Sequence, residues 1–132
     1  MELAPGLEAE ITITVGEEDL ATAFGNEGVP VFATPALLSY FESACRQAVE
    51  AALPAESLTV GTWAEIKHLA ATPPGMKITF KARLTEVERR RLLFEVEAHD
   101  EVEKVGEGRH ERYYLNAPKF LAKAEEKAGP RE

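Results

Sequence analysis

The chain has 132 residues, of which 45% are hydrophobic and 29% are charged, and its formal net charge is −8. This length and apolar content allow one domain with a hydrophobic core but not two. The acidic balance argues against nonspecific binding to nucleic acid or to an anionic membrane, although a local basic patch could still hold a small anion. The single cysteine, Cys45, excludes an intramolecular disulfide and a cysteine-rich metal site.

The start of the chain has neither a basic segment nor an apolar run, and no stretch reaches the roughly 18 apolar residues of a membrane span. We therefore expect a soluble, cytoplasmic protein. Low counts of Gln, Asn, Cys and Met beside many charged residues favour a thermophilic source. We expect one domain over residues 1–132, with its core in residues 7–116 and a terminal helix and tail in residues 117–132.

The first predicted element is a half-buried strand, because apolar and polar side chains alternate over residues 7–15. Residues 16–33 follow, and they carry Gly25, Gly28 and Pro30 among apolar side chains. This segment is too irregular for a helix or strand and too apolar for a fully solvated loop. We interpret it as a flap that leads into the next element.

A long helix is predicted from Thr34 to Leu53, because Thr34 can cap its first turn, Pro35 suits the next position and Pro54 ends it. At helical spacing its apolar residues form a single stripe, made of Leu37, Leu38, Phe41, Ala44, Cys45, Ala48, Val49 and Ala52. Glu42 falls on the shoulder of that stripe. A carboxylate there either turns to water or is hydrogen-bonded in a site.

Four further strands are predicted by alternation over residues 58–68, 76–87, 92–99 and 105–116, and a short helix follows over residues 118–128. The even-numbered residues from Leu58 to His68 are expected on one face. An antiparallel sheet has one face free to bury something, and only the 34–53 helix has a matching apolar stripe. The sequence therefore predicts an α+β hotdog fold, an antiparallel sheet of about five strands wrapped around one long helix, with a ligand-binding cup as the alternative.

Thr34, Glu42 and His68 supply a hydroxyl, a carboxylate and an imidazole, the side chains that acyl transfer by a nucleophile or an activated water requires. The N-terminus of the predicted helix would add N–H groups that can stabilise an oxyanion. Simpler interpretations remain open, with Thr34 as a helix cap only and His68 as a core histidine bonded to the backbone. His99 and His110 are expected to be solvated. No metal-ligand or phosphate-loop pattern is present.

Three segments of the chain resemble the thioesterase family typified by fluoroacetyl-coenzyme A thioesterase, within a similarity that spans about residues 7–116. They are Ala33-Thr34-Pro35 with Tyr40-Phe41-Glu42, Val60-Gly61-Thr62 leading to Ile66 through Gly75, and Gly106 through Arg112. The resemblance implies a hotdog fold, a dimer with its site at the subunit interface, and hydrolysis of acyl-CoA thioesters. It also implies residue roles: catalytic for Thr34, Glu42 and His68, a backbone contact to substrate for Gly61, and a substrate or CoA contact for Arg112.

We therefore expect an enzyme that hydrolyses a short- or medium-chain acyl-CoA, works as a homodimer or tetramer, and needs no cofactor because CoA is part of the substrate. The alternative is a non-catalytic module that binds acyl-CoA or another apolar ligand. A hotdog hydratase is not favoured, since the predicted helix has no Asp-x-x-x-x-His pair.

Two finer expectations concern the site. Glu42 should hydrogen-bond His68 and hold its tautomer, while surface cations bind CoA, with Arg112 first and Lys77, Lys81 or residues 89–91 next. The fluoroacetate-specific enzyme has an aromatic lid ahead of its helix, whereas residues 24–29 here are glycine-rich. We therefore expect no strong discrimination in favour of fluorine.

Overall fold

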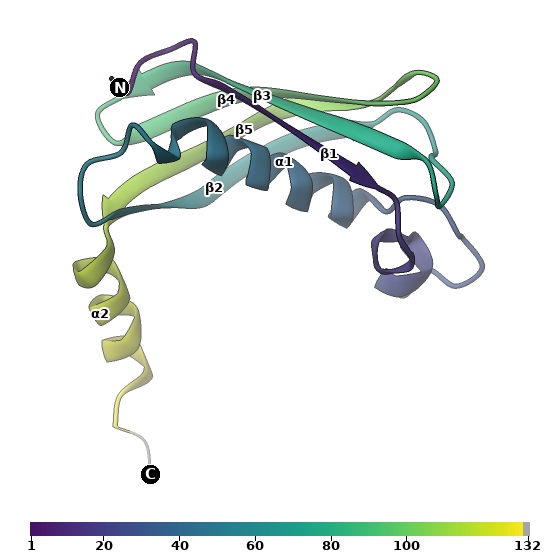
Figure 1. Cartoon of the computed structure of the whole chain (residues 1–132). Coiled ribbons are helices and arrows are strands. Elements are labelled where there is room, and N and C mark those ends of the chain that lie inside the picture. Colours follow the sequence, from purple (N-terminus) through teal and green to yellow (C-terminus); the bar gives the residue numbers. More distant parts are fainter. Residues whose placement is uncertain (131–132) are drawn as a thin grey trace.

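The computed structural model describes residues 1–130, so the last two residues of the predicted tail lie outside it. One sheet is formed by β1 (Glu8–Thr14), β2 (Ser57–His68), β3 (Lys77–Glu88), β4 (Arg91–Asp100) and β5 (Lys104–Asn116). All neighbours pair antiparallel, in the order β1-β3-β4-β5-β2. The long helix α1 (Thr34–Glu50) crosses one face of this curved sheet (Figure 1). The predicted hotdog arrangement is confirmed.

The apolar stripe of α1 is what attaches the helix to the sheet. Leu37, Phe41, Ala44, Cys45 and Val49 are fully buried in the core, together with alternate residues of β3 and β4. Burying one Phe or Leu side chain contributes about 1.5–3 kcal/mol, so this contact fixes the helix firmly. Burial also raises the pKa of the Cys45 thiol, which keeps it protonated and unreactive.

The edge strand β2 contains a β-bulge, because its pairing register with β5 shifts around Thr62. An extra residue in one strand reverses which face the following side chains occupy. Gly61, before the bulge, faces α1, since a Cβ added there would collide with the Glu42 carboxylate. His68, beyond the bulge, also faces α1. The predicted single alternation over residues 58–68 is therefore wrong before the bulge.

The predicted flap over residues 16–33 contains two short 3₁₀ turns, Glu17–Asp19 and Ala21–Phe24. Its base is fixed, because the buried Asp19 carboxylate accepts a hydrogen bond from the Tyr40 hydroxyl of α1 at 2.8 Å. Burial and this neighbouring carboxylate raise the pKa of Tyr40 to about 12. The tip is different, since residues 24–28 are exposed. The flap therefore joins the core at its base and meets solvent at its tip.

The second helix, α2 (Ala117–Ala128), extends away from the sheet at the end of β5 (Figure 1). The side chain of Asn116 caps it by accepting a hydrogen bond from the Lys119 N–H at 3.0 Å. None of its residues is buried. No helix within residues 1–130 is long and apolar enough to cross a membrane.

Candidate active site

The N-terminus of α1 meets the end of β2 through one side-chain hydrogen bond. Thr34 Oγ1 lies 2.8 Å from Nδ1 of His68. The helix is preceded by Ala33 as its N-cap residue, and no side chain caps it. The Thr34 hydroxyl therefore contacts the imidazole rather than capping the helix, while the residue itself stays exposed at the surface. A hydroxyl and a base are thus paired where a substrate can reach them.

The imidazole of His68 is held between this hydroxyl and an aromatic side chain. The ring of Phe32 meets it edge-on, with 6.2 Å between ring centroids. Burial lowers the pKa of His68, which keeps the ring neutral at neutral pH and able to accept a proton. Its other nitrogen, Nε2, is buried and has no hydrogen-bond partner within residues 1–130.

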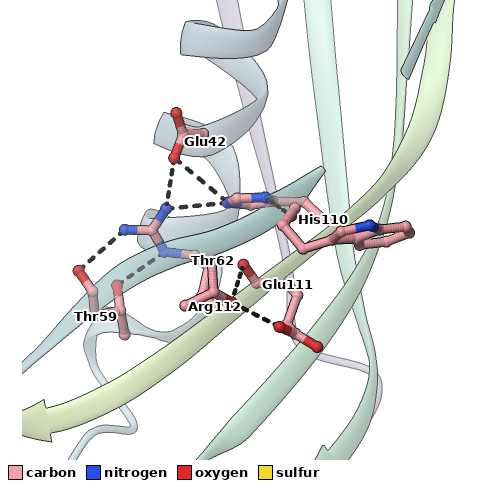
Figure 2. A network of polar contacts seen from close by, with 7 residues as sticks. Glu42, Thr59, Thr62, His110, Glu111 and Arg112 are labelled. Carbon is pink, nitrogen blue, oxygen red and sulfur yellow. Dashed lines mark hydrogen bonds and ion pairs between the residues drawn. The ribbon is translucent and has the colours of Figure 1, made fainter. Parts of the chain in front are cut away.

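Glu42 lies two turns further along α1 and belongs to a separate group. Its Oε2 is 3.3 Å from Nη1 of Arg112 and 3.6 Å from Nε2 of His110 (Figure 2). The prediction that Glu42 hydrogen-bonds His68 is wrong within one chain, since neither a hydrogen bond nor an ion pair joins them. Eight residues of α-helix carry Glu42 about 12 Å along the axis from Thr34, which a single side chain cannot bridge.

Arg112 is the cation that holds this carboxylate. Its Nε and Nη2 donate to the Oγ1 and backbone carbonyl of Thr59, both at 3.0 Å, and Nη1 donates to Glu42 (Figure 2). Arg112 is only 5% exposed, so it is not the surface cation that was expected. Burial lowers the pKa of its guanidinium while Glu42 opposes the shift, and an arginine stays charged under these conditions.

His110 was expected to be solvated, and that prediction is wrong, since the residue is 2% exposed. Its Nδ1 lies 2.8 Å from the carbonyl oxygen of Trp63, and its ring stacks on Phe94 with centroids 6.5 Å apart. The charged residues around it suggested an exposed strand. The useful signal was spacing, because His110 lies two residues before Arg112 and therefore shares its face of β5.

Gly61 lets the carboxylate come close to the edge strand. A Cβ at this residue would collide with Oε2 of Glu42 and lie 3.0 Å from Cε1 of His110. Glu42 nevertheless keeps 39% of its side chain exposed. The carboxylate is therefore anchored on one side and open to solvent on the other, beside the free edge of β2.

The predicted catalytic residues thus form two groups, a hydroxyl–imidazole pair and an anchored carboxylate. The first can transfer a proton during attack on an acyl carbon, and the second can accept a proton or hold a water. Residues 1–130 contain no group of three or more His, Cys, Asp or Glu side chains that could hold a metal ion.

Comparison with known proteins agrees with this picture. The family model for fluoroacetyl-CoA-specific thioesterases (FlK) matches residues 15–118. The fluoroacetyl-CoA thioesterase of Streptantibioticus cattleyicolor is 42% identical over 97 residues, which are 74% of this chain and 70% of that protein. A solved structure of FlK aligns with a TM-score of 0.88 and 33% identity, covering 96% of this chain and 98% of its own. A hypothetical thioesterase-superfamily protein of Thermus thermophilus aligns with a TM-score of 0.88 and 29% identity, covering 96% and 93%.

Fold, site chemistry and these relatives together define a hotdog-fold thioesterase. Within that class, the chain belongs to the family of fluoroacetyl-CoA-specific thioesterases. The matched segment contains all five residues to which the sequence resemblance gave roles, namely Thr34, Glu42, Gly61, His68 and Arg112.

Proposed function

We propose that this protein hydrolyses the thioester of a short- or medium-chain acyl-CoA, releasing a carboxylate and free CoA without any further cofactor. Family membership supports the reaction class. The observation that carries the site is the 2.8 Å contact between Thr34 Oγ1 and His68 Nδ1 at the exposed N-terminus of α1. A base with a lowered pKa and a hydroxyl are what acyl transfer at neutral pH requires.

In this proposal neutral His68 accepts the proton of the Thr34 hydroxyl, or of a water, as the oxygen attacks the thioester carbonyl. The C–S bond then breaks and the leaving thiolate takes the proton from the imidazolium. If Thr34 is the nucleophile, water hydrolyses the acyl ester with the same base. The first turn of α1 presents the positive end of the helix dipole to the developing oxyanion.

We further infer that the working form is a homodimer joined at the free edge of β2. This strand ends the sheet, and Trp63 and Leu69 beside the edge are 43% and 48% exposed. Natural proteins usually pair or cover such edges. A dimer also addresses the separation of the two groups, because Thr34 and Glu42 are about 12 Å apart along one helix and cannot both reach one carbonyl.

Antiparallel pairing of two β2 strands centred near Ala64 and Glu65 would set Glu42 and Gly61 of one copy beside His68 of the other. Each of two sites would then contain a hydroxyl, an imidazole and a carboxylate. This arrangement predicts a dimer in sedimentation experiments at micromolar concentration. A species of 14.5 kDa, the mass of one chain, would contradict it.

Mixing two impaired variants tests whether each site uses residues of both chains. After denaturation and joint refolding, His68→Ala and Glu42→Gln should form some heterodimers in which one site has both native residues. Activity should then exceed the sum of the separate variants. A same-chain site would give no such recovery, because every site would lack one of the two residues. Refolding each variant alone is the control.

The substrate is tested by measuring thiol release from acetyl-, fluoroacetyl- and longer acyl-CoA. We expect turnover without strong preference for fluorine. Fluoroacetyl and acetyl groups differ by one C–F in place of one C–H, and a hydrophobic pocket gains only about 1–3 kcal/mol from a difference of that size. The flap tip supports this expectation, because it carries Gly25 and Gly28 and its Phe24 is 51% exposed. A preference of many thousandfold would contradict it. Binding without turnover of any ester would favour the binding module.

The same assay at several salt concentrations tests how CoA is held. Lys81 lies in an ion pair with a glutamate of β1, and Arg91 is held by two carboxylates. Lys77 and the β3–β4 turn residues Arg89 and Arg90 are exposed cations that can meet phosphates. Binding through such exposed charges weakens as salt rises, so KM should increase.

A further inference from the structure

Both ring nitrogens of His110 have partners whose chemistry fixes the proton. The Trp63 carbonyl can only accept, so Nδ1 of His110 must be the donor in their 2.8 Å contact. The Arg112 guanidinium can only donate, so Nε2 must be the acceptor in their 3.1 Å contact. The ring is therefore neutral, with its single proton on Nδ1. Burial and the neighbouring Arg112 charge both lower the pKa of His110, which agrees with this state.

This tautomer changes how the contact between His110 and Glu42 should be understood. Their 3.6 Å separation is not an ion pair, because a neutral ring carries no charge and its Nε2 has no proton to donate to the carboxylate. The attraction comes from Nη1 of Arg112, which donates to Nε2 of His110 and to Oε2 of Glu42 (Figure 2). Thr59 accepts from the other two nitrogens. All three nitrogens of the guanidinium are therefore held in one orientation.

We propose that His110 is a positioning residue for Glu42, linking the Trp63 carbonyl at the β2 bulge to Arg112 and so aiming the carboxylate at the strand edge beside Gly61. The inference rests on the proposed function, in which the Glu42 carboxylate completes a site that also contains Thr34 and His68. His110 itself is buried beside Arg112 and is only 2% exposed, so we assign it no direct contact with substrate. Its contribution is an acceptor of fixed direction, which no charged histidine could supply to an arginine.

Two amide substitutions separate the contacts of this ring. In His110→Gln the side-chain oxygen can reach the place of Nε2 and accept from Arg112. In His110→Asn the amide nitrogen can reach the place of Nδ1 and donate to Trp63, but no atom of residue 110 then accepts from Arg112. Both variants lose the ring that stacks on Phe94, so each controls for the other.

We expect His110→Gln to keep most of the wild-type kcat and His110→Asn to lower it roughly ten- to a hundredfold, the cost of misplacing a reacting group by about 1 Å. KM should change little in either variant. The reverse order, with Asn active and Gln impaired, would overturn the proposal, because the bulge contact rather than Arg112 would then be what matters.

A double-mutant cycle with Glu42→Gln separates positioning from a purely structural role. If His110 acts through Glu42, His110→Asn should cost little further activity once Glu42 is already Gln. Equal losses of kcat in both backgrounds would overturn the proposal. Urea unfolding of all four proteins would detect any loss of folded enzyme that imitates an activity effect.

The protonation state can be read without activity, which keeps this inference separate from the proposed function. Nitrogen-15 spectra of His110 should show Nδ1 protonated and Nε2 unprotonated at neutral pH. The side-chain N–H signals of Arg112 should exchange faster with solvent in His110→Asn than in His110→Gln. A protonated Nε2, or equal exchange in the two variants, would overturn the positioning role. Absence of turnover in the wild type would overturn only the proposed function.

Discussion

Replacing His68 with alanine should lower kcat for acyl-CoA hydrolysis by about 10²–10⁴-fold, the usual contribution of a general base. The reason is that the Thr34 hydroxyl, 2.8 Å from Nδ1, would lose its proton acceptor. Thiol release under saturating substrate measures the effect, and circular dichroism checks that the fold is intact. Full activity in the alanine variant would return His68 to the role of a core histidine.

The hydroxyl and the pH profile provide the matched controls for this result. Thr34→Ser should retain more activity than Thr34→Ala if the oxygen takes part, and equal activity in both would leave Thr34 without a chemical role.

Because burial lowers the pKa of His68, the neutral base persists below the ordinary pKa of about 6.5. Activity should therefore fall only at a lower pH than a free imidazole would give.

The same shift affects stability with a definite sign. A buried histidine with a lowered pKa binds its proton more tightly in the unfolded chain than in the folded one. Its contribution to stability is therefore present above about pH 6.5 and is lost as the pH falls below that value. The pKa values of His68 and His110 are both lowered, so the two residues change the stability in the same direction as the pH falls.

Two glycine-to-alanine substitutions in the sheet should have different consequences, one for activity and the other for stability, although each adds a single methyl group. Gly61→Ala should reduce kcat about a hundredfold by displacing the Glu42 carboxylate from its anchored place. It should lower the free energy of unfolding less than a clash with backbone atoms would, since Glu42 is partly exposed and its flexible side chain can turn into solvent. Thiol release and urea unfolding report the two effects separately.

Gly108→Ala is the structural counterpart. A Cβ on this β5 residue would collide with the carbonyl oxygen of Glu65 and lie 2.8 Å from Cα of Ile66. These are backbone atoms of β2 and cannot turn aside, so the strands must separate at a cost of about 1–3 kcal/mol or more. Equal destabilisation by both glycine variants would show that Glu42 is not free to move. Undiminished turnover in Gly61→Ala would show that its direction is unimportant.

The elements of the fold were predictable because each has a local cause. Alternation in the strands and the apolar stripe of the helix are imposed by burial on one face, and both leave a direct record in the sequence. The observed bounds differ by only a few residues, and α1 ends at Glu50 rather than at Leu53. The bulge at Thr62 was not predictable in this way, since an inserted residue is recorded only in the pairing with β5.

The residue types of the site were also found from the sequence, and their contacts were not. Thr34 and His68 are separated by 33 intervening residues, and their hydrogen bond depends on how α1 crosses β2. Glu42 was assigned to His68 because three complementary groups suggest one cluster. The rise of the helix instead carries Glu42 to Arg112 and His110 of β5. Alternation shows that these two residues share one face of the strand, but it does not show which face points toward the helix.

The sequence by itself therefore determined the hotdog class, the set of a hydroxyl, a carboxylate and an imidazole, and the resemblance to a thioesterase family. These depend on local periodicity and on residue identity, which a single chain records directly. Only the tertiary structure decided that Thr34 pairs with His68, that Arg112 faces inward to hold Glu42, and that His110 is buried beside Arg112. Those facts depend on distances between segments far apart in sequence, which are set when the sheet closes over the helix.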